Sequence, residues 1–328
     1  MSAAPPAASS PDHDESTASF ATEVARGLQA TPKTLPCRFF YDAEGSRLFE
    51  QICLLPEYYP TRTEASILRA HADELASLCA PQVTVVELGA GSATKTRLLF
   101  EALSRQGVRP RYAPIDISPT ALAAAQATLR AADPGLVVLP IAAEYQEGLR
   151  AVPERAGEKR LFLWLGTSVG NLEPEESAGI LRSVRLEMAA GDFFLLGIDR
   201  RKDRETLERA YDDPQGVTAR FNLNLLGRIN RELGGHFDLG SFRHRALYDE
   251  PPGRVEMHLV SLARQRVRID ALGATVSFEA GETIHTENSY KFSSGEIAAL
   301  ASEAGLVVDR DWRDDEELFS LCLLRADS

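Results

Sequence analysis

One short segment, residues 83–95 with the sequence VTVVELGAGSATK, constrains the fold more than any other part of the chain. Its apolar residues up to Leu88 predict a buried parallel strand, because the run is too short for a helix of its own. Gly89 and Gly91 follow, and glycines permit a tight turn with positive φ that brings the backbone close to a ligand. Residues 92–103 then have helical character. A strand, a glycine turn and a helix in this order are typical of the nucleotide-binding unit of a doubly wound α/β sheet.

The spacing of the glycines bears on which nucleotide this turn binds. A dinucleotide fingerprint has a third glycine three residues after the second, where this chain has Thr94. The pattern E-L-G-A-G-S-A, with Glu87 before the turn, resembles the first motif of methyltransferases that use S-adenosylmethionine (SAM). SAM has no pyrophosphate, so the start of the helix need not cradle one. The motif favours a SAM site and leaves open another nucleotide cofactor or a purely structural turn.

Apolar strand-like runs and helical patterns alternate around this unit. The expected strands are 111–117, 136–141, 161–165 and 193–198, and the expected helices are 64–78, 119–132 and 173–188. Such alternation predicts a parallel sheet with right-handed crossovers. A helix at 294–304 and two strands at 306–309 and 319–324, expected to be antiparallel, complete this sheet.

The alternation is interrupted between residues 200 and 281. This part holds helical patterns at 204–211 and 217–233 and strand-like runs at 255–267 and 274–278, which indicate an insertion that forms a second lobe. We expect an α/β fold: a doubly wound, Rossmann-like SAM-methyltransferase sheet with a smaller α+β substrate lobe. The expected division is a methyltransferase domain at 61–199 plus 286–328, a substrate-binding lobe at 18–60 plus 200–285, and a disordered leader at 1–17, which is rich in Ala, Pro, Ser and Asp.

Charge and composition exclude several classes of partner. The formal net charge of −12 argues against nucleic acid or an anionic membrane, because both need a basic face on the protein. No apolar run approaches the length of a membrane span. The scattered cysteines and histidines show no CxxC or other metal-ligand spacing, so we expect reduced thiols, no metal and a cytoplasmic protein. A small molecule is the expected partner, with no obligate protein partner.

Polar residues at the carboxyl ends of the strands are candidates for ligand contact. Asp116 ends the second strand and can accept hydrogen bonds from ribose hydroxyls, although an acid that caps the following helix is the structural alternative. Glu144 and Tyr145 follow the third strand, where the acid can accept from the adenine amino group and the ring can pack on its face. Asn171 follows the fourth strand in the sequence GTSVGN, where methyltransferases that act on amines often place Asn or Asp. An ordinary turn is the alternative there.

Longer motifs resemble one family in particular, the histidine Nα-methyltransferases, which make hercynine (Nα,Nα,Nα-trimethylhistidine) on the route to ergothioneine. The matching segments are PKTLPCRFFYDAEGSRLFE, LPEYYPTRTEA, VELGAGSATKT, GTSVGNL, AYDDPQGVTARFNLNLL and HTENSYKF, which extend from about residue 32 to residue 292. LPEYYPTRTE and AYDD-x2-GVTA-x-FN are far more specific than a glycine turn, because generic SAM enzymes lack them.

The resemblance implies a role for individual residues. It implies that Tyr58, Asn171 and Tyr211 surround the substrate carboxylate and amine, and that Glu287 and Ser289 hold the imidazole. The residues implied to act in catalysis are Tyr41, Asn171 and Tyr211, Met257 is implied to line the same pocket, and the residues implied to bind SAM are Gly89, Gly91, Lys95, Asp116, Glu144 and Tyr145. The chain departs from relatives at Glu144-Tyr145, where they have Asp-Phe, and at Tyr290, where some have Cys.

The expected function is therefore SAM-dependent transfer of three methyl groups to the α-amine of L-histidine, giving hercynine for ergothioneine biosynthesis. Three alternatives stay open: an Nα-methyltransferase of another α-amino acid or of partly methylated histidine, a nucleotide-dependent oxidoreductase, and a non-catalytic module that binds SAM.

Overall fold

The computed structural model describes residues 11–91, 93–153 and 157–327, and of residues 11–18 only the backbone. The chain forms two compact units. The N-terminal unit contains the described residues up to Tyr58 together with Arg204–Asp249 and Val255–Asn288, and the sheet unit contains Tyr59–Asp203, Glu250–Arg254 and the residues from Ser289 onward. None of the described helices is long and apolar enough to cross a membrane.

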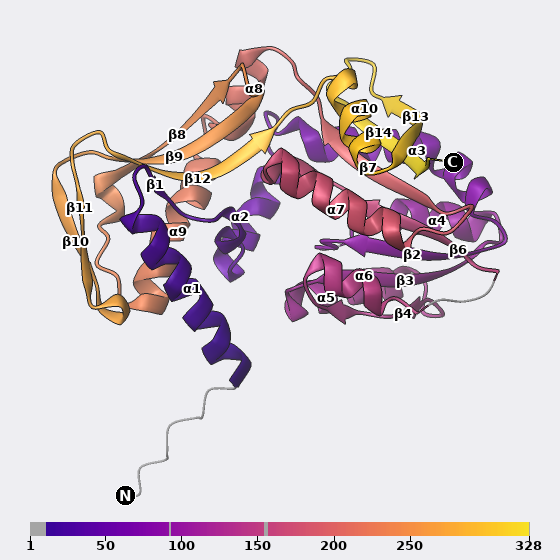
Figure 1. The fold of residues 1–328 in the computed structure, drawn as a ribbon, viewed down its shortest axis with the longest axis horizontal. Coiled ribbons are helices and arrows are strands. Elements are labelled where there is room, and N and C mark those ends of the chain that lie inside the picture. Colours follow the sequence, from indigo (N-terminus) through magenta and orange to yellow (C-terminus); the bar gives the residue numbers. More distant parts are fainter. Residues whose placement is uncertain (1–10, 92, 154–156, 328) are drawn as a thin grey trace, which may run out of the picture. The chain divides into compact units, whose positions relative to one another are not determined.

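The sheet unit is built on one twisted sheet whose strands lie in the order β13-β14-β7-β6-β2-β3-β4, with β5 beside β3 (Figure 1). Its strands are β2 (Gln82–Leu88), β3 (Arg109–Asp116), β4 (Val137–Val138), β5 (Ile141–Ala142), β6 (Lys159–Trp164), β7 (Phe193–Asp199), β13 (Leu306–Arg313) and β14 (Phe319–Ala326). Neighbours from β7 to β4 are parallel, whereas β14 is antiparallel to both β7 and β13. The expected α/β class, the parallel sheet and its antiparallel final strands are confirmed.

Helices cover both faces of this sheet, which explains why its strands read as continuous apolar runs. They are α3 (Tyr59–Cys79), α4 (Thr96–Arg105), α5 (Pro119–Ala132), α6 (Tyr145–Ala151), α7 (Pro174–Glu187) and α10 (Ser294–Glu303). Along β2 the side chains alternate: Val83 and Val85 join the core formed with α3 and α4, whereas Val86 and Leu88 join the core formed with α6, α7 and α10. The strand is therefore fixed in register from both sides, which in turn fixes the glycine turn that follows it.

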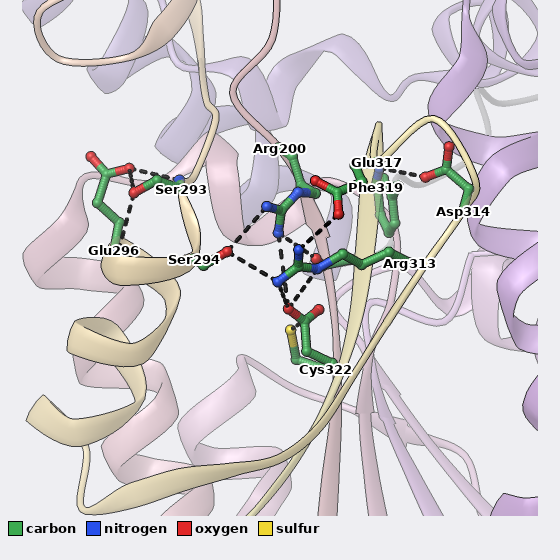
Figure 2. A network of polar contacts seen from close by, with 11 residues as sticks. Arg200, Ser293, Ser294, Glu296, Arg313, Asp314, Glu317, Phe319 and Cys322 are labelled. Atoms are coloured by element: carbon green, nitrogen blue, oxygen red, sulfur yellow. Dashed lines mark hydrogen bonds and ion pairs between the residues drawn. The ribbon is translucent and has the colours of Figure 1, made fainter.

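A network of polar contacts connects the end of β7 to β13, β14 and the start of α10 in the sheet unit (Figure 2). The guanidinium of Arg200, directly after β7, donates to Ser320 Oγ at 2.9 Å and to Ser294 Oγ at 3.1 Å. Arg313 donates to the same Ser294 hydroxyl at 3.1 Å and to Asp311 Oδ2 at 2.5 Å. Two arginines thus join β7, β13 and β14 to the first residue of α10.

The N-terminal unit combines helices with a small mixed sheet. Its elements are α1 (Pro11–Gln29), β1 (Lys33–Thr34), η1 (Cys37–Phe40), α2 (Ala43–Cys53), α8 (Arg204–Tyr211), α9 (Val217–Leu233), η3 (Leu239–Ser241), β8 (Phe242–Asp249), β9 (Arg254–Ser261), β10 (Gln265–Ile269), η4 (Asp270–Leu272), β11 (Ala274–Phe278) and β12 (Thr283–Tyr290). The sheet order is β1-β12-β9-β8, and β10 and β11 form a separate antiparallel hairpin. The first residue of β9, Arg254, and the last two residues of β12, Ser289 and Tyr290, belong to the sheet unit.

Four local expectations differ from the structure. The expected strand 136–141 is divided into β4 and β5, because Pro140 lacks the N–H that a continuous ladder needs. The expected helix 92–103 begins only at Thr96, since Ala93 has a φ of +52° that is incompatible with a right-handed helix. The expected strand 255–267 comprises β9 and β10, which belong to different sheets.

The fourth difference concerns the expected leader at 1–17. Residues 1–10 lie outside the described residues, whereas residues 11–17 belong to α1. Once the amphipathic part of α1 has nucleated, each added residue costs little and gains one backbone hydrogen bond, so the helix extends into a segment whose composition alone indicated disorder.

Candidate functional site

The glycine turn after β2 has the geometry that its sequence predicts. Gly89 and Gly91 have φ of +67° and +50°, and the Gly89 N–H donates to the Ile115 carbonyl of β3 at 2.9 Å. A Cβ at Gly89 would lie 2.9 Å from the hydroxyl oxygen of Tyr145, whereas a Cβ at Gly91 would meet no described heavy atom within 4 Å. Gly89 is therefore required by the close approach of Tyr145, and Gly91 leaves open space beside the turn.

Asp116 lies at the end of β3 and joins the two loops that follow β2 and β3. Its carboxylate accepts from the backbone N–H of Ser118 at 2.8 Å and also from the N–H of Gly91. Burial raises the pKa of Asp116, and these two donors oppose that effect. The structural alternative was that Asp116 caps α5, but the cap is Ser118, whose hydroxyl accepts from the Ala121 N–H. A carboxylate has about four acceptor positions, so these contacts leave capacity for ribose hydroxyls.

The residues expected on the adenine side lie at the start of α6. Glu144 is exposed and occupies the N-cap position without a side-chain cap bond, and Tyr145 is the first helical residue. The Tyr145 ring lies edge-on to the indole of Trp164, with ring centroids 6.0 Å apart. The structure thus brings Tyr145 to Gly89, whereas the Glu144 side chain makes no hydrogen bond to the part of the chain that the structure describes.

Lys95 is held by an acid whose role the sequence did not reveal. Its ammonium forms an ion pair with Glu64, a fully buried residue of α3. The other carboxylate oxygen of Glu64 accepts from the Gly166 N–H at 2.7 Å, and a Cβ at Gly197 would lie only 2.0 Å from that oxygen. The Lys95 side chain keeps 24% of its surface exposed. Glu64 therefore fixes the direction of Lys95 against the loop that follows β6.

Asn171 ends the short helix η2 (Ser168–Asn171) in that same loop. Its side-chain oxygen Oδ1 is buried and has no hydrogen-bond donor among the described residues. An unpaired buried acceptor costs about 1–3 kcal/mol, so Asn171 Oδ1 is a candidate acceptor for a donor group of a bound ligand or water. The preceding Gly170 packs against the backbone of Tyr290, whose carbonyl oxygen would lie 2.6 Å from a Cβ at that position.

In the N-terminal unit the three tyrosines expected at the substrate site, Tyr41, Tyr58 and Tyr211, belong to one aromatic cluster. The Tyr58 ring lies edge-on to Tyr211 at 6.2 Å and to Phe49 at 6.2 Å. Phe49 in turn contacts Tyr41 at 5.6 Å. Tyr41, Tyr58 and Tyr211 come from segments up to 170 positions apart in the sequence and are brought together by edge-to-face packing.

Glu287 of β12 is the acid of this unit that acts on the aromatic cluster. Burial, followed by the charge of Glu287, raises the pKa of Cys37 to about 12. Burial and then the same carboxylate raise the pKa of Tyr41 well above its usual range, even though 47% of the Tyr41 surface is exposed. A tyrosine hydroxyl is protonated at neutral pH without any shift, and these effects act in the same direction, so the Tyr41 hydroxyl is available to donate a hydrogen bond.

Met257 lies on β9, the strand next to β12, and is buried. Its carbonyl accepts from the Thr286 hydroxyl at 3.0 Å, one residue before Glu287. The structure therefore places Met257 and Glu287 on neighbouring strands of one sheet.

Ser289 is connected to a buried charge network in the sheet unit. Its hydroxyl oxygen accepts from the Lys291 ammonium at 2.7 Å, and the same ammonium lies 2.7 Å from Asp199 Oδ2. Asp199 also accepts from the Tyr59 hydroxyl at 2.8 Å. Lys291 is fully buried. Sequence reasoning identified Ser289 and missed Lys291, although the lysine stands two positions later in the motif TENSYKF.

Tyr290, the departure from relatives, is fixed by its own partners. Its hydroxyl donates to Glu173 at 2.6 Å and accepts from Arg254 at 2.8 Å. Successive residues of a strand point to opposite faces, so the Tyr290 ring points away from the face that carries the side chain of Ser289.

Comparisons with known proteins find similarity to methyltransferases and to proteins of ergothioneine biosynthesis. A family model described as "Histidine-specific methyltransferase, SAM-dependent" matches residues 20–326. The chain is 45% identical over 301 residues to the histidine N-alpha-methyltransferase of Mycobacterium tuberculosis, covering 92% of this chain and 93% of that protein. It is 32% identical to ergothioneine biosynthesis protein 1 of Neurospora crassa, over 86% of this chain and 32% of that protein. It is 26% identical to L-tryptophan methyltransferase trpM of Psilocybe serbica, over 93% of this chain and 92% of that protein.

Proposed function

The chain belongs to the family of SAM-dependent, histidine-specific methyltransferases, and we propose that it transfers methyl groups from SAM to the α-amine of L-histidine. Three successive transfers give hercynine, a precursor for ergothioneine. The observation that carries the choice of substrate is the 45% identity with a histidine N-alpha-methyltransferase over nearly the full length of both chains.

The cofactor site proposed here consists of the glycine turn and the residues around it. The open space at Gly91, the acceptor capacity of Asp116 and the oriented ammonium of Lys95 fit the polar groups of SAM. Asp116 would accept from the ribose hydroxyls, and Glu144 and Tyr145 would bind the adenine. SAM supplies a methyl group on a sulfonium, which is a good leaving group. The protein then contributes mainly the alignment of the attacking nitrogen.

The imidazole of the substrate is proposed to bind at Glu287 and Ser289. Glu287 accepts from one ring N–H, and Ser289 serves the other ring nitrogen. A site built on such pairs rejects analogues that lack the polar groups, by roughly 10⁴-fold in favourable cases, because its own buried groups are then left without partners. Met257 would line the ring.

The amino-acid end of histidine is proposed to bind Tyr58, Tyr211 and Asn171. The tyrosine hydroxyls and the Asn171 amide supply donors for the carboxylate, and the buried Asn171 Oδ1 accepts from the amine. Tyr41, which is protonated at neutral pH, would act nearby as a donor. As methyl groups accumulate, the aromatic rings stabilise the quaternary ammonium through their faces.

A product assay tests this function directly. The purified protein is incubated with SAM and, in separate reactions, with each free amino acid, and the products are identified by mass spectrometry. Mono-, di- and trimethylated histidine are expected. Methylated tryptophan without methylated histidine would assign the chain instead to the activity named for the Psilocybe serbica relative.

Two further outcomes address the remaining alternatives. Thermal stabilisation by SAM with no methylated product would indicate a non-catalytic SAM-binding module. Stabilisation by NAD and not by SAM would indicate an oxidoreductase.

A further inference from the structure

The motif AYDDPQGVTARFN, at residues 210–222, contains more than the substrate residue Tyr211. Tyr211 is the last residue of α8, where backbone carbonyls have no partner within the helix. Its carbonyl oxygen lies 2.8 Å from Nε2 of His244, a buried residue of β8. The end of α8 is therefore held by a side chain from a strand more than 30 positions later.

The second ring nitrogen of His244 has an equally defined partner. His244 Nδ1 lies 2.9 Å from the amide nitrogen Nδ2 of Asn222, which is fully buried in α9. The same Nδ2 donates to the His258 carbonyl at 3.2 Å, and this contact orients the amide with its nitrogen toward both acceptors. Asn222 thus donates to His244, and His244 accepts at Nδ1.

These contacts fix the protonation state of the ring. A carbonyl oxygen only accepts and an amide nitrogen only donates, so Nε2 carries the hydrogen and Nδ1 carries none. A second proton on Nδ1 would face the donor of Asn222. Burial also lowers the pKa of His244, in the same direction. His244 is therefore a neutral, singly oriented link between α9 and the end of α8.

The other side of the same turn is also pinned. The carboxylate of Asp213 accepts from the N–H groups of Val217 and Thr218 at 2.9 and 2.7 Å, at the start of α9. Gly216 between them has a φ of +66°, which favours glycine. The turn that follows Tyr211 is therefore held at its start by His244 and at its end by Asp213.

We propose that His244 and Asn222 are positioning residues for Tyr211: by fixing the end of α8 they aim the Tyr211 side chain, which lies edge-on to Tyr58, at the amino-acid end of the substrate. This inference rests on the proposed function, in which Tyr211 contacts histidine. It assigns a structural role to Asn222, the last residue of the motif, and to His244, which lies outside the motif.

Steady-state kinetics on matched variants test the proposal. His244→Leu removes both ring contacts and is expected to raise the KM for histidine at least about tenfold. His244→Gln supplies an amide donor and an amide acceptor again and is expected to return the KM to within about threefold of the wild type. The Kd of SAM, measured by calorimetry, is expected to change less than twofold in both variants, as for residues that act only on the amino-acid site.

A matched control separates positioning from general loss of stability. Asn230 of α9 makes two hydrogen bonds to the backbone of Phe237, each of 2.8 Å, and it has no part in the proposed site. Asn230→Leu is expected to lower the melting temperature as His244→Leu does while leaving the KM within about twofold. An equal rise of KM in both variants, or no rise in His244→Leu, overturns the proposal.

A double-mutant cycle tests the route through Tyr211. In a Tyr211→Phe background, His244→Leu is expected to add less than about threefold to the KM, because the hydroxyl that it positions is already absent. Full additivity contradicts the proposal. If His244→Leu does not fold, Asn222→Ala takes its place, with an expected rise of about threefold or more, and an unchanged KM again refutes the positioning role. A wild-type protein that makes no methylhistidine refutes the proposed function instead.

Discussion

At the scale of single residues, the two buried acids on strands β2 and β7, Glu87 and Asp199, have pKa values shifted in opposite directions. Among the described residues the hydrogen-bond donors to Glu87 are the hydroxyl groups of Thr96, at 2.7 Å, and of Tyr112, and burial raises the pKa of Glu87 to about 7. Burial acts in the same direction on Asp199, but the ammonium groups of Lys291 and Lys202 outweigh it and lower the pKa of Asp199. The difference between cationic and neutral partners therefore decides which acid titrates near neutral pH.

Glu87 gives a pH-dependent stability that can be measured. Its folded pKa lies above its unfolded value, so the stability that it contributes is fully present below about pH 4.5 and is lost as the pH rises through about 7. Glu87→Gln removes this titration. Relative to the variant, the wild type is expected to lose about 2 kcal/mol of unfolding free energy between pH 5.5 and pH 8, as measured by urea denaturation. A difference between the two proteins that does not change with pH would exclude a buried, titrating Glu87.

Glu287 carries the proposed specificity for histidine. Glu287→Gln keeps the size of the side chain and removes the charge, so kcat/KM for histidine is expected to fall at least about a hundredfold. The Kd of SAM is expected to stay within about twofold, because Glu287 is not among the residues proposed to bind the cofactor. Equal losses in turnover and in SAM binding would contradict the imidazole role.

At the scale of elements, the turn between β2 and α4 shows how a local sequence rule and a distant contact combine. Both Gly89 and Gly107 have positive φ, of +67° and +71°, and both follow the end of a regular element. Only Gly89 faces a side chain, since a Cβ at Gly107 would meet no described heavy atom within 4 Å. Substitution of Gly107 would therefore introduce backbone strain alone, whereas substitution of Gly89 would introduce backbone strain and a steric clash with Tyr145.

Alanine substitutions at these glycines use that difference. Gly107→Ala is expected to cost about 1 kcal/mol of stability and to leave SAM binding unchanged. Gly89→Ala incurs the same backbone strain and also displaces Tyr145, so it is expected to weaken SAM binding at least about tenfold. Calorimetric titration of SAM into both variants checks this. Equal affinities would show that the contact between Gly89 and Tyr145 does not shape the cofactor site.

Elements with their own start and stop signals could be predicted from the sequence. α5 begins where Ser118 and Pro119 indicate it, and α8, α9 and β11 have the expected bounds. α2, β8 and β12 were not expected. β12 has the sequence TIHTENSY, in which the polar residues Thr286, Glu287 and Ser289 are buried, and hydrophobic periodicity cannot indicate the burial of polar residues.

At the scale of the whole molecule, each unit is assembled from segments that are far apart in the chain. Family motifs identify single residues such as Lys95, Ser289 and Tyr211. The partners that orient them stand elsewhere: Glu64 for Lys95, and His244 for Tyr211, at separations of 31 and 33 positions. No local pattern encodes such pairs, because they form only when the chain has folded. The residues that would contact the ligands could therefore be identified from the sequence, whereas the residues that orient them could not.

The central claim for the molecule is that the methyl groups are transferred to the α-amine of histidine, and isotope labelling tests this claim most directly. L-Histidine with ¹⁵N only at the α-amine is incubated with the protein and SAM whose methyl group carries ¹³C, and the product is examined by NMR. Our account predicts one-bond coupling between each new ¹³C methyl group and the α-¹⁵N nucleus. Methyl signals without that coupling would place the transfer on the imidazole ring and contradict the account.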